Sequence, residues 1–298
     1  MAMGYQLWTS PITGYRRRGT RLAELRSLLG SGITAHAILE PLQSCPAEAS
    51  AKVMRDLLIQ RDFDVAGVQS RQEGAVLGFV ARDDLESGLV EEHLKPLTAD
   101  QLISDSTPLP SVLAFLKDKE RAFVLIGPQV RGIVTQADLN KPPVRVYLFG
   151  LISLLEMHLA FWIRAAYGDE SWQRVLKKPR LDAAKKVQAD RQTRNQDASL
   201  LDCLQFCDKR DLVVASDDLR NQLNLKSRNE ARSLLKRAEH LRNNLAHSQH
   251  DIVKGSSWKK TIQLVERVEV VVLASDERVE KKAMSSANRG KRGLWASA

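Results

Sequence analysis

The chain has 298 residues, a length that fits about two domains and is enough to bury a substantial core. Its formal net charge of +9 indicates a polyanionic partner, although charge alone does not separate a nucleic acid from a membrane surface. The odd, sparse count of three cysteines argues against a disulfide framework and for a reducing compartment, so we expect a cytoplasmic protein.

Neither the N-terminus nor the most apolar run predicts contact with a membrane. The N-terminus lacks the continuous apolar core of a secretory signal. Residues 146–163 are nearly long enough to span a bilayer, but Glu156 and His158 near their middle make spanning costly. We therefore expect a buried central helix there and no membrane partner.

Residues 1–40 form an N-terminal extension with a basic patch from Arg16 to Arg18 and a short helical pattern that ends near Gly30. A solvated basic face is the favoured interpretation of this patch, and contact with a phosphate of RNA or of a nucleotide is the alternative. The first domain follows, at residues 41–141.

This first domain contains a weak internal repeat, in which each copy has a helix followed by two strands. The expected helices are residues 47–62 and 108–119, and the expected strands are 64–68, 75–85, 122–127 and 130–139. The octets GFVARDDL and GIVTQADL align without gaps, so that Gly78 of the first copy corresponds to Gly132 of the second. Apolar runs bounded by turn residues predict buried strands, and the domain is therefore α+β.

The aligned octets resemble the closing signature of the CBS motif, named for cystathionine β-synthase. The resemblance covers about a third of the chain and implies a pair of βαββα repeats, a module that commonly binds adenosine nucleotides in its clefts or holds subunits together. The implied ligand is ATP, ADP or AMP, acting as a regulator.

By position, the resemblance assigns Thr135 and Asp138 to ligand binding in the second copy, and Thr107 matches the usual start of that motif. The first copy keeps Asp84 but has Ala81 where Thr is expected. A hydroxyl at a strand end can hydrogen-bond phosphate, and a carboxylate can accept hydrogen bonds from ribose hydroxyls. The alternative role for Asp84 and Asp138 is that of a helix N-cap.

The proline pair after Lys141 marks a domain boundary, because proline cannot continue a preceding helix. Residues 142–282 predict an all-α bundle of about four or five helices, with a central helix at 144–166. The charged residues 167–196 form a surface helix and linker, for which solvated charge is favoured over a strip that faces RNA. The tail, 283–298, is basic, contains glycine and is predicted to be disordered, with nonspecific affinity for polyanions.

Three further features of the second domain carry expectations. Cys203 and Cys207 are expected to be buried thiols, because no other metal ligands accompany them, and no metal site is predicted. Residues 258–282 predict a last amphipathic helix. Glu156 and His158 are expected to form satisfied interior contacts, and the alternative is that Glu156 pairs with a polar cluster near residue 242.

Residues 227–250 predict one helix with polar chemistry at its C-terminal end. An S-x-x-E capping box opens the helix. Apolar residues then recur every three or four positions on one side: Ala231, Leu234, Leu235, Ala238, Leu241 and Leu245. Asn243 and His247 are four residues apart on one face, and Arg242 lies beside them.

These residue types suit the cleavage of RNA. A neutral histidine can exchange a proton near neutral pH, an arginine can clamp a phosphate, and an asparagine can orient either one. Little more is needed, because the 2′-OH of RNA is an internal nucleophile. A base must deprotonate it, an acid must protonate the leaving 5′ oxygen, and a cation must stabilise the charge of the phosphorane. The alternative is that Arg242 and His247 only stabilise the negative end of the helix dipole.

The string RNNLAH resembles the R-x4-6-H signature of the HEPN superfamily (higher eukaryotes and prokaryotes nucleotide-binding), whose active members are metal-independent ribonucleases. The resemblance implies a composite active site with one motif from each subunit of a homodimer, and it assigns Arg242, Asn243 and His247 to that site. One subgroup has Tyr two residues after the His; this chain has Gln249 there.

We therefore expect a nucleotide-regulated, metal-independent endoribonuclease that leaves 2′,3′-cyclic phosphate and 5′-OH ends and requires no cofactor for catalysis. RNA, an adenine nucleotide and a second copy of the chain are the expected partners. One alternative is a noncatalytic protein, either an adenine-nucleotide sensor or an RNA-binding scaffold. A further alternative is a structural partner that masks another, toxin-like protein.

Overall fold

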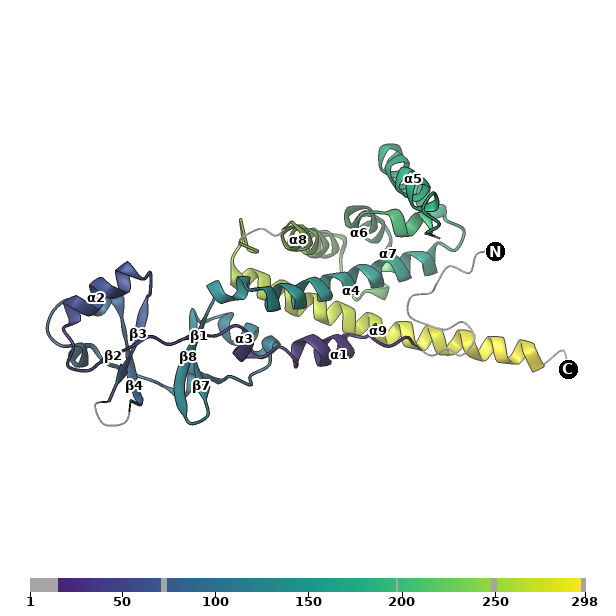
Figure 1. Ribbon diagram of the computed structural model, residues 1–298. Helices are drawn as coiled ribbons and strands as arrows, with labels where there is room; N and C mark the ends of the chain where they lie inside the picture. The colour runs from purple at the N-terminus through teal and green to yellow at the C-terminus, as the bar shows by residue number, and fades with distance from the viewer. Residues whose placement is uncertain (1–15, 71–73, 197, 248–250, 296–298) are drawn as a thin grey trace. The chain divides into compact units, whose positions relative to one another are not determined.

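The computed structural model describes residues 16–70, 74–196, 198–247 and 251–295, with side chains as far as residue 282. The chain forms two compact units, one made of residues 30–144 and the other of residues up to 29 together with those from 145 onward. Figure 1 shows that the first unit contains all the labelled strands and that the second is helical. The N-terminal extension predicted over 1–40 is thus divided between the two units.

The α+β unit consists of two four-stranded sheets with the strand orders β1-β8-β7-β6 and β2-β3-β4-β5. Its strands are β1 Glu40–Pro41, β2 Ser44–Pro46, β3 Val65–Gln69, β4 Val76–Ala81, β5 Lys95–Pro96, β6 Leu102–Ser104, β7 Arg121–Ile126 and β8 Gln129–Thr135. Its helices are α2 Ala51–Gln60 and α3 Leu109–Leu116. Each copy of the repeat therefore runs strand, helix, strand, strand, and each sheet is completed by one short strand from outside that copy.

The two copies share their strand register residue by residue. Val68 pairs with Gly78 in the first copy, Val124 pairs with Gly132 in the second, and each pairing is followed directly by a β-bulge. A Cβ atom on Gly78 would lie 2.3 Å from the carbonyl oxygen of Lys95, so only glycine lets β5 approach β4 this closely. The repeat predicted from the aligned octets is therefore present, and its two copies have the same strand pairing.

The helical unit is built around α4, Pro142–Ala166, and α9, Trp258–Trp295. Its remaining helices are α1 Leu22–Leu25, α5 Lys178–Gln192, α6 Phe206–Ala215, α7 Asp217–Gln222 and α8 Arg228–Ala246. Among the described residues, α4 is the one helix long and apolar enough to cross a membrane, but 61% of its most apolar window is buried against its neighbours. Such burial is the behaviour of a core helix, as the sequence predicted.

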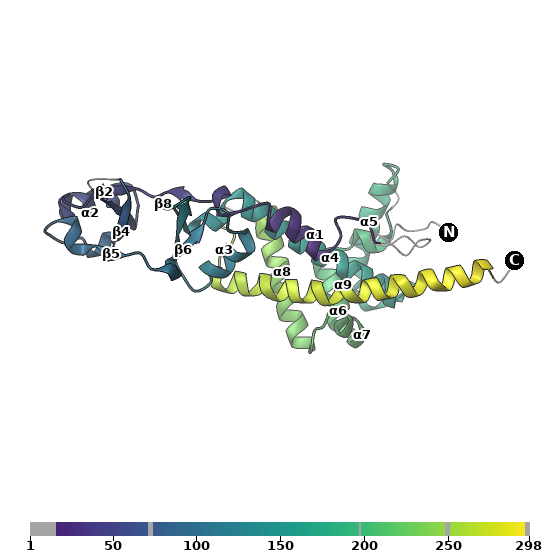
Figure 2. The same cartoon turned by 90° about the horizontal axis from the view of Figure 1, so that it is seen from below.

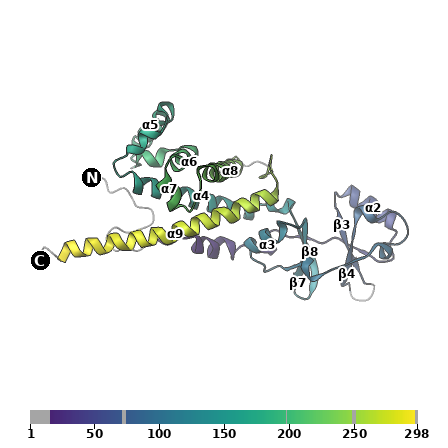
Figure 3. The same cartoon turned by 180° about the vertical axis from the view of Figure 1, so that it is seen from behind.

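The arrangement of these helices leaves one side of α8 open to solvent. Figures 1 and 3 show α6 and α8 end-on beside α4, and Figure 2 shows α8 crossing α9. All six apolar residues of the predicted α8 stripe are buried against this core. The polar residues of α8 therefore point away from it.

A short 3-10 turn at Leu200–Cys203 precedes α6. One expectation for the helical unit requires correction. The chain continues as helix through Trp295, past residue 283, where a disordered tail was expected. Helix elongation adds a backbone hydrogen bond for each residue fixed, so a long amphipathic helix can extend into a polar end.

A buried polar network joins α4 to α9. His158 is fully buried, with its Nδ1 2.7 Å from Ser275 Oγ and its Nε2 3.2 Å from Asp276 Oδ1. Trp162 Nε1 donates to the same serine oxygen at 2.6 Å. Trp162 donates to the Ser275 hydroxyl, and this hydroxyl can donate in turn to His158 Nδ1. The proton of a neutral imidazole then lies on Nε2, which donates to Asp276.

Asp276 also holds the N-terminal segment on α9. Its carboxylate accepts hydrogen bonds from the Arg16 guanidinium, which is almost completely buried, and from the backbone N–H of Leu22 at 2.9 Å. More exposed ion pairs follow along α9, with Arg21 bound to Glu280 and Arg26 bound to Glu269. The basic patch expected to be a solvated face therefore includes one residue, Arg16, that is part of the core.

The stability of the helical unit is expected to fall in mildly acidic solution because of His158. Burial lowers the pKa of His158 below its ordinary value of 6.5, the neighbouring Asp276 opposes this effect and Arg16 adds to it. The unfolded chain therefore binds a proton at a pH where the folded chain does not, and the free energy of unfolding decreases as the pH falls below about 6.5.

Tryptophan fluorescence during urea unfolding measures this effect selectively, because all five tryptophans lie outside residues 30–144. The unfolding midpoint should be lower at about pH 5.5 than at about pH 7.5. The variant His158→Gln should show a flatter dependence over this range. Equal wild-type midpoints at the two pH values would contradict the assignment.

Candidate functional site

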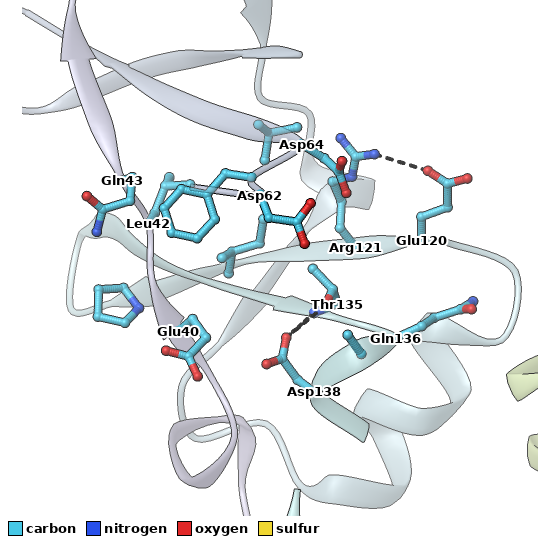
Figure 4. Close-up of a pocket in the computed structure, with 15 residues that line it drawn as sticks. Glu40, Leu42, Gln43, Asp62, Asp64, Glu120, Arg121, Thr135, Gln136 and Asp138 are labelled. Carbon is cyan, nitrogen blue, oxygen red and sulfur yellow. Dashed lines mark hydrogen bonds and ion pairs between the residues drawn. The ribbon is translucent and has the colours of Figure 1, made fainter. Parts of the chain in front are cut away.

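A cleft of about 650 Å3 lies within the α+β unit, between segments of the two repeats. It is lined by residues 40–43 in and after β1, 62–65 at the start of β3, 120–121 at the start of β7, and 133 and 135–138 at the end of β8. Strand ends from both copies thus meet at one opening, as Figure 4 shows.

Thr135 and Asp138, two of the predicted ligand residues, lie together in this cleft (Figure 4). The backbone N–H and the hydroxyl of Thr135 both donate to Asp138 Oδ2, at 2.7 and 2.9 Å. Lys141 Nζ lies 2.8 Å from Asp138 Oδ1. Asp138 thus closes the turn after β8, but it is not the N-cap proposed as its alternative role, because Gln136 holds that position of the following 3-10 turn. A carboxylate has about four acceptor positions, so capacity for a ligand hydroxyl remains.

The other two predicted ligand residues lie outside this cleft. The Thr107 hydroxyl accepts a hydrogen bond from the backbone N–H of Ser104 at 3.0 Å and closes the turn before α3. Asp84 binds Lys95 at 2.5 Å, and Ala81, which aligns with Thr135, supplies no hydroxyl. The structure therefore brings together two of the four residues named from the sequence.

Carboxylates that the sequence did not single out dominate the lining of the cleft. Glu40, Asp62, Asp64 and Glu120 join Asp138 there, and Arg121 is the one cation among the lining residues. Three of the additional carboxylates have cationic partners: Lys141 for Glu40, Arg82 for Asp64 and Arg121 for Glu120. The cleft therefore favours ligand groups that donate hydrogen bonds, such as sugar hydroxyls, over closely spaced phosphates.

Asp62 is the exception among these acids. Its backbone has φ = 56°, in the left-handed region, and its side chain is exposed. Within the described residues its carboxylate makes no hydrogen bond or ion pair. Figure 4 shows it directed toward the side of the cleft formed by Thr135 and Asp138. The Asp62 carboxylate can therefore contact a ligand in the cleft without giving up an interaction that stabilises the fold.

The second candidate site is the C-terminal end of α8. The helix begins as predicted, because the Ser227 hydroxyl accepts the N–H of Glu230 at 3.1 Å. The Glu230 carboxylate, however, accepts the N–H of Lys226 rather than that of Ser227 and binds Arg267 at 2.5 Å. This ion pair joins the start of α8 to α9.

Arg242, Asn243 and His247 occupy the last turn of α8. Arg242 Nη1 donates to Asn243 Oδ1 at 3.2 Å, and both side chains are half-buried. His247 is the C-cap residue, and its backbone N–H donates to the Asn243 carbonyl at 3.0 Å. Its imidazole is exposed, and among the described residues no hydrogen bond or ion pair joins it to Arg242 or Asn243.

This arrangement brings together the guanidinium and the amide of the predicted cluster. The guanidinium is oriented by the amide of Asn243, and the exposed imidazole of His247 lies one helical turn from that amide. Gln249, the position of the subgroup Tyr, lies outside the described residues. Among those residues no group of three or more His, Cys, Asp or Glu side chains is arranged to hold a metal ion.

The polar residues beside the cluster have structural contacts. Asn244 Nδ2 donates to the carbonyl of Ile252 at 2.8 Å and holds the segment that leads into α9. Glu156 does not reach the cluster, because it pairs with Lys209 of α6 at 2.8 Å. The interior pairing favoured from the sequence is thus present. The role of Asn244 was missed, although the doubled asparagine in RNNLAH was the available signal.

No protein-family model and no curated protein sequence matches the chain. Solved structures of CBS-domain proteins match its N-terminal part, about 40% of the chain, and leave the helical unit uncovered.

Three of these structures show the degree of similarity. An uncharacterised conserved protein from Pyrococcus horikoshii is 18% identical with a TM-score of 0.33, over 37% of this chain and 90% of that chain. CBSX2 in complex with AMP is 18% identical with a TM-score of 0.34, over 39% and 98%. The CBS domain of a bacterial CNNM/CorC family Mg2+ transporter in complex with ATP is 16% identical with a TM-score of 0.33, over 40% and 91%.

Proposed function

We propose that the chain is a nucleotide-regulated, metal-independent endoribonuclease whose chemistry is carried by Arg242, Asn243 and His247. The His247 imidazole would take the proton of the 2′-OH or protonate the leaving 5′ oxygen. Arg242, oriented by Asn243, would neutralise the developing charge on the phosphorane. The observation that carries the proposal is an exposed imidazole one helical turn from Asn243, the amide that binds the Arg242 guanidinium.

A second copy of the chain completes the mechanism. Transesterification by the 2′-OH uses a base and an acid, whereas one cluster supplies one imidazole. Two clusters related by a two-fold axis would supply both, with an arginine on each side of the phosphate. The proposed active form is therefore a homodimer.

The α+β unit would act as the sensor, as a CBS-like pair of repeats. Its support is the repeated strand register and the cleft of about 650 Å3 in which the Thr135–Asp138 turn is placed. A ligand in this cleft would regulate cleavage only if it bound one arrangement of the dimer more tightly than another. AMP and ATP, which accompany two of the CBS-domain structures, are the first ligands to test.

The acidic lining predicts a preference for adenosine and AMP over ATP in the absence of divalent cations. Asp62→Asn should lower the ratio of the ATP dissociation constant to that of AMP by roughly three- to tenfold, because it removes one repulsive charge from the cleft. Isothermal titration calorimetry in EDTA gives both constants. Asp56→Asn, an exposed carboxylate of α2 outside the cleft, is the matched control and should leave the ratio unchanged. A wild-type protein that prefers metal-free ATP would contradict this electrostatic account.

The nuclease proposal is tested by incubating the full chain with mixed RNA in EDTA, alone and with AMP, ADP or ATP. Cleavage in EDTA that changes with nucleotide supports it. Nucleotide binding or an RNA gel shift without cleavage supports the second candidate, a noncatalytic sensor or RNA-binding scaffold, which the Thr135–Asp138 cleft favours independently of α8.

A further inference from the structure

We propose that the exposed face of α8 is a phosphate-binding track that leads single-stranded RNA to His247. The track is defined by Arg228, Arg232 and Lys236, successive residues one turn apart. The inference rests on the proposed function for its direction, because the proposed function places RNA cleavage at the His247 end of α8.

The helix geometry places the track and the active cluster on one side. At about 100° per residue, Arg232, Lys236, Asn243 and His247 fall within about 60° of one another around the helix. This side is opposite the buried apolar stripe, and Arg228, Arg232, Lys236 and His247 are all exposed. At about 1.5 Å per residue, Lys236 lies about 16 Å along the axis from His247, within reach of a few nucleotides.

The positive charge of this face is not balanced by acids on the same helix. The acidic residues of α8 are Glu230 and Glu239, and each is already paired, with Arg267 of α9 and Arg210 of α6. Within the part of the chain that the structure describes, the three track cations make no hydrogen bond or ion pair. Their charges are therefore available to an anionic partner.

A groove marks the start of the track. Arg228 and Arg232 border a depression of about 210 Å3 whose other wall is the end of α6, at Val214 and Ala215. The one carboxylate that lines it, Asp211, is bound at 2.9 Å by Arg210, which it shares with Glu239. Two neighbouring guanidinium groups that border one depression form a setting in which a phosphate oxygen can accept hydrogen bonds from both.

Single-stranded RNA fits this surface better than a duplex or a protein. Cations about 6 Å apart along one helix form a narrow row, to which a flexible strand can adjust the spacing of its phosphates. The track carries no aromatic side chain on which bases can stack, so binding should be electrostatic and tolerant of sequence. Acidic peptides and anionic vesicles are the competing partners that the experiment includes.

The test measures how binding depends on salt, using a labelled oligouridine single strand and the full chain in EDTA. All proteins carry His247→Ala so that the RNA remains intact. Each phosphate contact contributes about 0.7 to the slope of log affinity against log salt for single strands. The triple variant R228Q/R232Q/K236Q should therefore lose about 2 from the slope. The matched control K178Q/K185Q/K186Q removes three exposed lysines from α5 and should retain the slope.

An unchanged slope in the α8 triple variant, or an equal loss in the α5 control, would overturn the track. Tighter binding to phosphatidylserine vesicles or to polyglutamate than to oligouridine would overturn it as well. The result is separable from the nuclease proposal. If the slope falls as expected but the wild-type protein never cleaves RNA, the track is supported and the nuclease proposal is contradicted. If the wild-type protein cleaves RNA but the slope is unchanged in the triple variant, the nuclease proposal is supported and the track is contradicted.

Discussion

Replacing Asp276 with alanine is expected to destabilise the helical unit by about 3–5 kcal/mol, the cost of leaving a buried charge without its partner. The Asp276 carboxylate accepts hydrogen bonds from Arg16, His158 and the backbone N–H of Leu22. The Arg16 side chain is only 2% exposed, so its guanidinium cannot turn to water when the carboxylate is removed. The N-terminal segment should therefore detach from α9 or unfold the helices with it.

The measurement is urea unfolding followed by tryptophan fluorescence at about pH 7.5, which reports the helical unit alone. The matched control is Glu280→Ala, one turn further along α9, which removes the partner of Arg21 in an ion pair that is about 40% exposed. Exposed pairs contribute about 0–1 kcal/mol, so this variant should unfold close to wild type. Equal midpoints for the Asp276 and Glu280 variants would show that the network contributes little.

Replacing His247 with alanine is expected to slow RNA cleavage by about 10²–10⁴-fold, the usual contribution of a general acid or base. The imidazole is exposed at the C-cap of α8 and makes no hydrogen bond or ion pair among the described residues, so the variant should fold normally. Single-turnover cleavage of a defined RNA in EDTA gives the rate, and the tryptophan unfolding curve verifies the fold.

His240→Ala is the matched control, since it removes an exposed imidazole from the same helix two turns earlier. It should retain the wild-type rate. Arg242→Lys keeps the charge but loses the planar fork that Asn243 orients, and it should fall between wild type and the His247 variant. A His247 variant that cleaves as fast as wild type would remove this residue from the mechanism.

Much of the fold could be predicted because local pattern and tertiary structure agree. The octets around Gly78 and Gly132 predicted a repeat, and the two glycines occupy the same register because each lies where a short strand approaches its neighbour. The apolar stripe of α8 is buried as a whole because a helical period places it on one side. Such features depend on residues close together in sequence.

The cleft could be predicted only in part, because its acidity depends on tertiary convergence. Asp62 and Glu120 are far apart in the chain and meet only when the two repeats pack together. The sequence likewise did not predict the contacts of Lys141 with Glu40 and Asp138, because Lys141 was interpreted only as part of a domain boundary. No pattern in the sequence indicated that Arg16 would be buried against α9.

The chemistry of the RNA ends tests the central claim most directly. Wild-type protein, purified as the full chain and treated with EDTA, should convert RNA into products with 2′,3′-cyclic phosphate and 5′-OH ends, and a substrate with a single 2′-deoxy sugar at the cut should resist cleavage there. Products with 3′-OH and 5′-phosphate ends, or continued cleavage at the 2′-deoxy site, would contradict attack by the neighbouring 2′-OH and with it the role given to the end of α8.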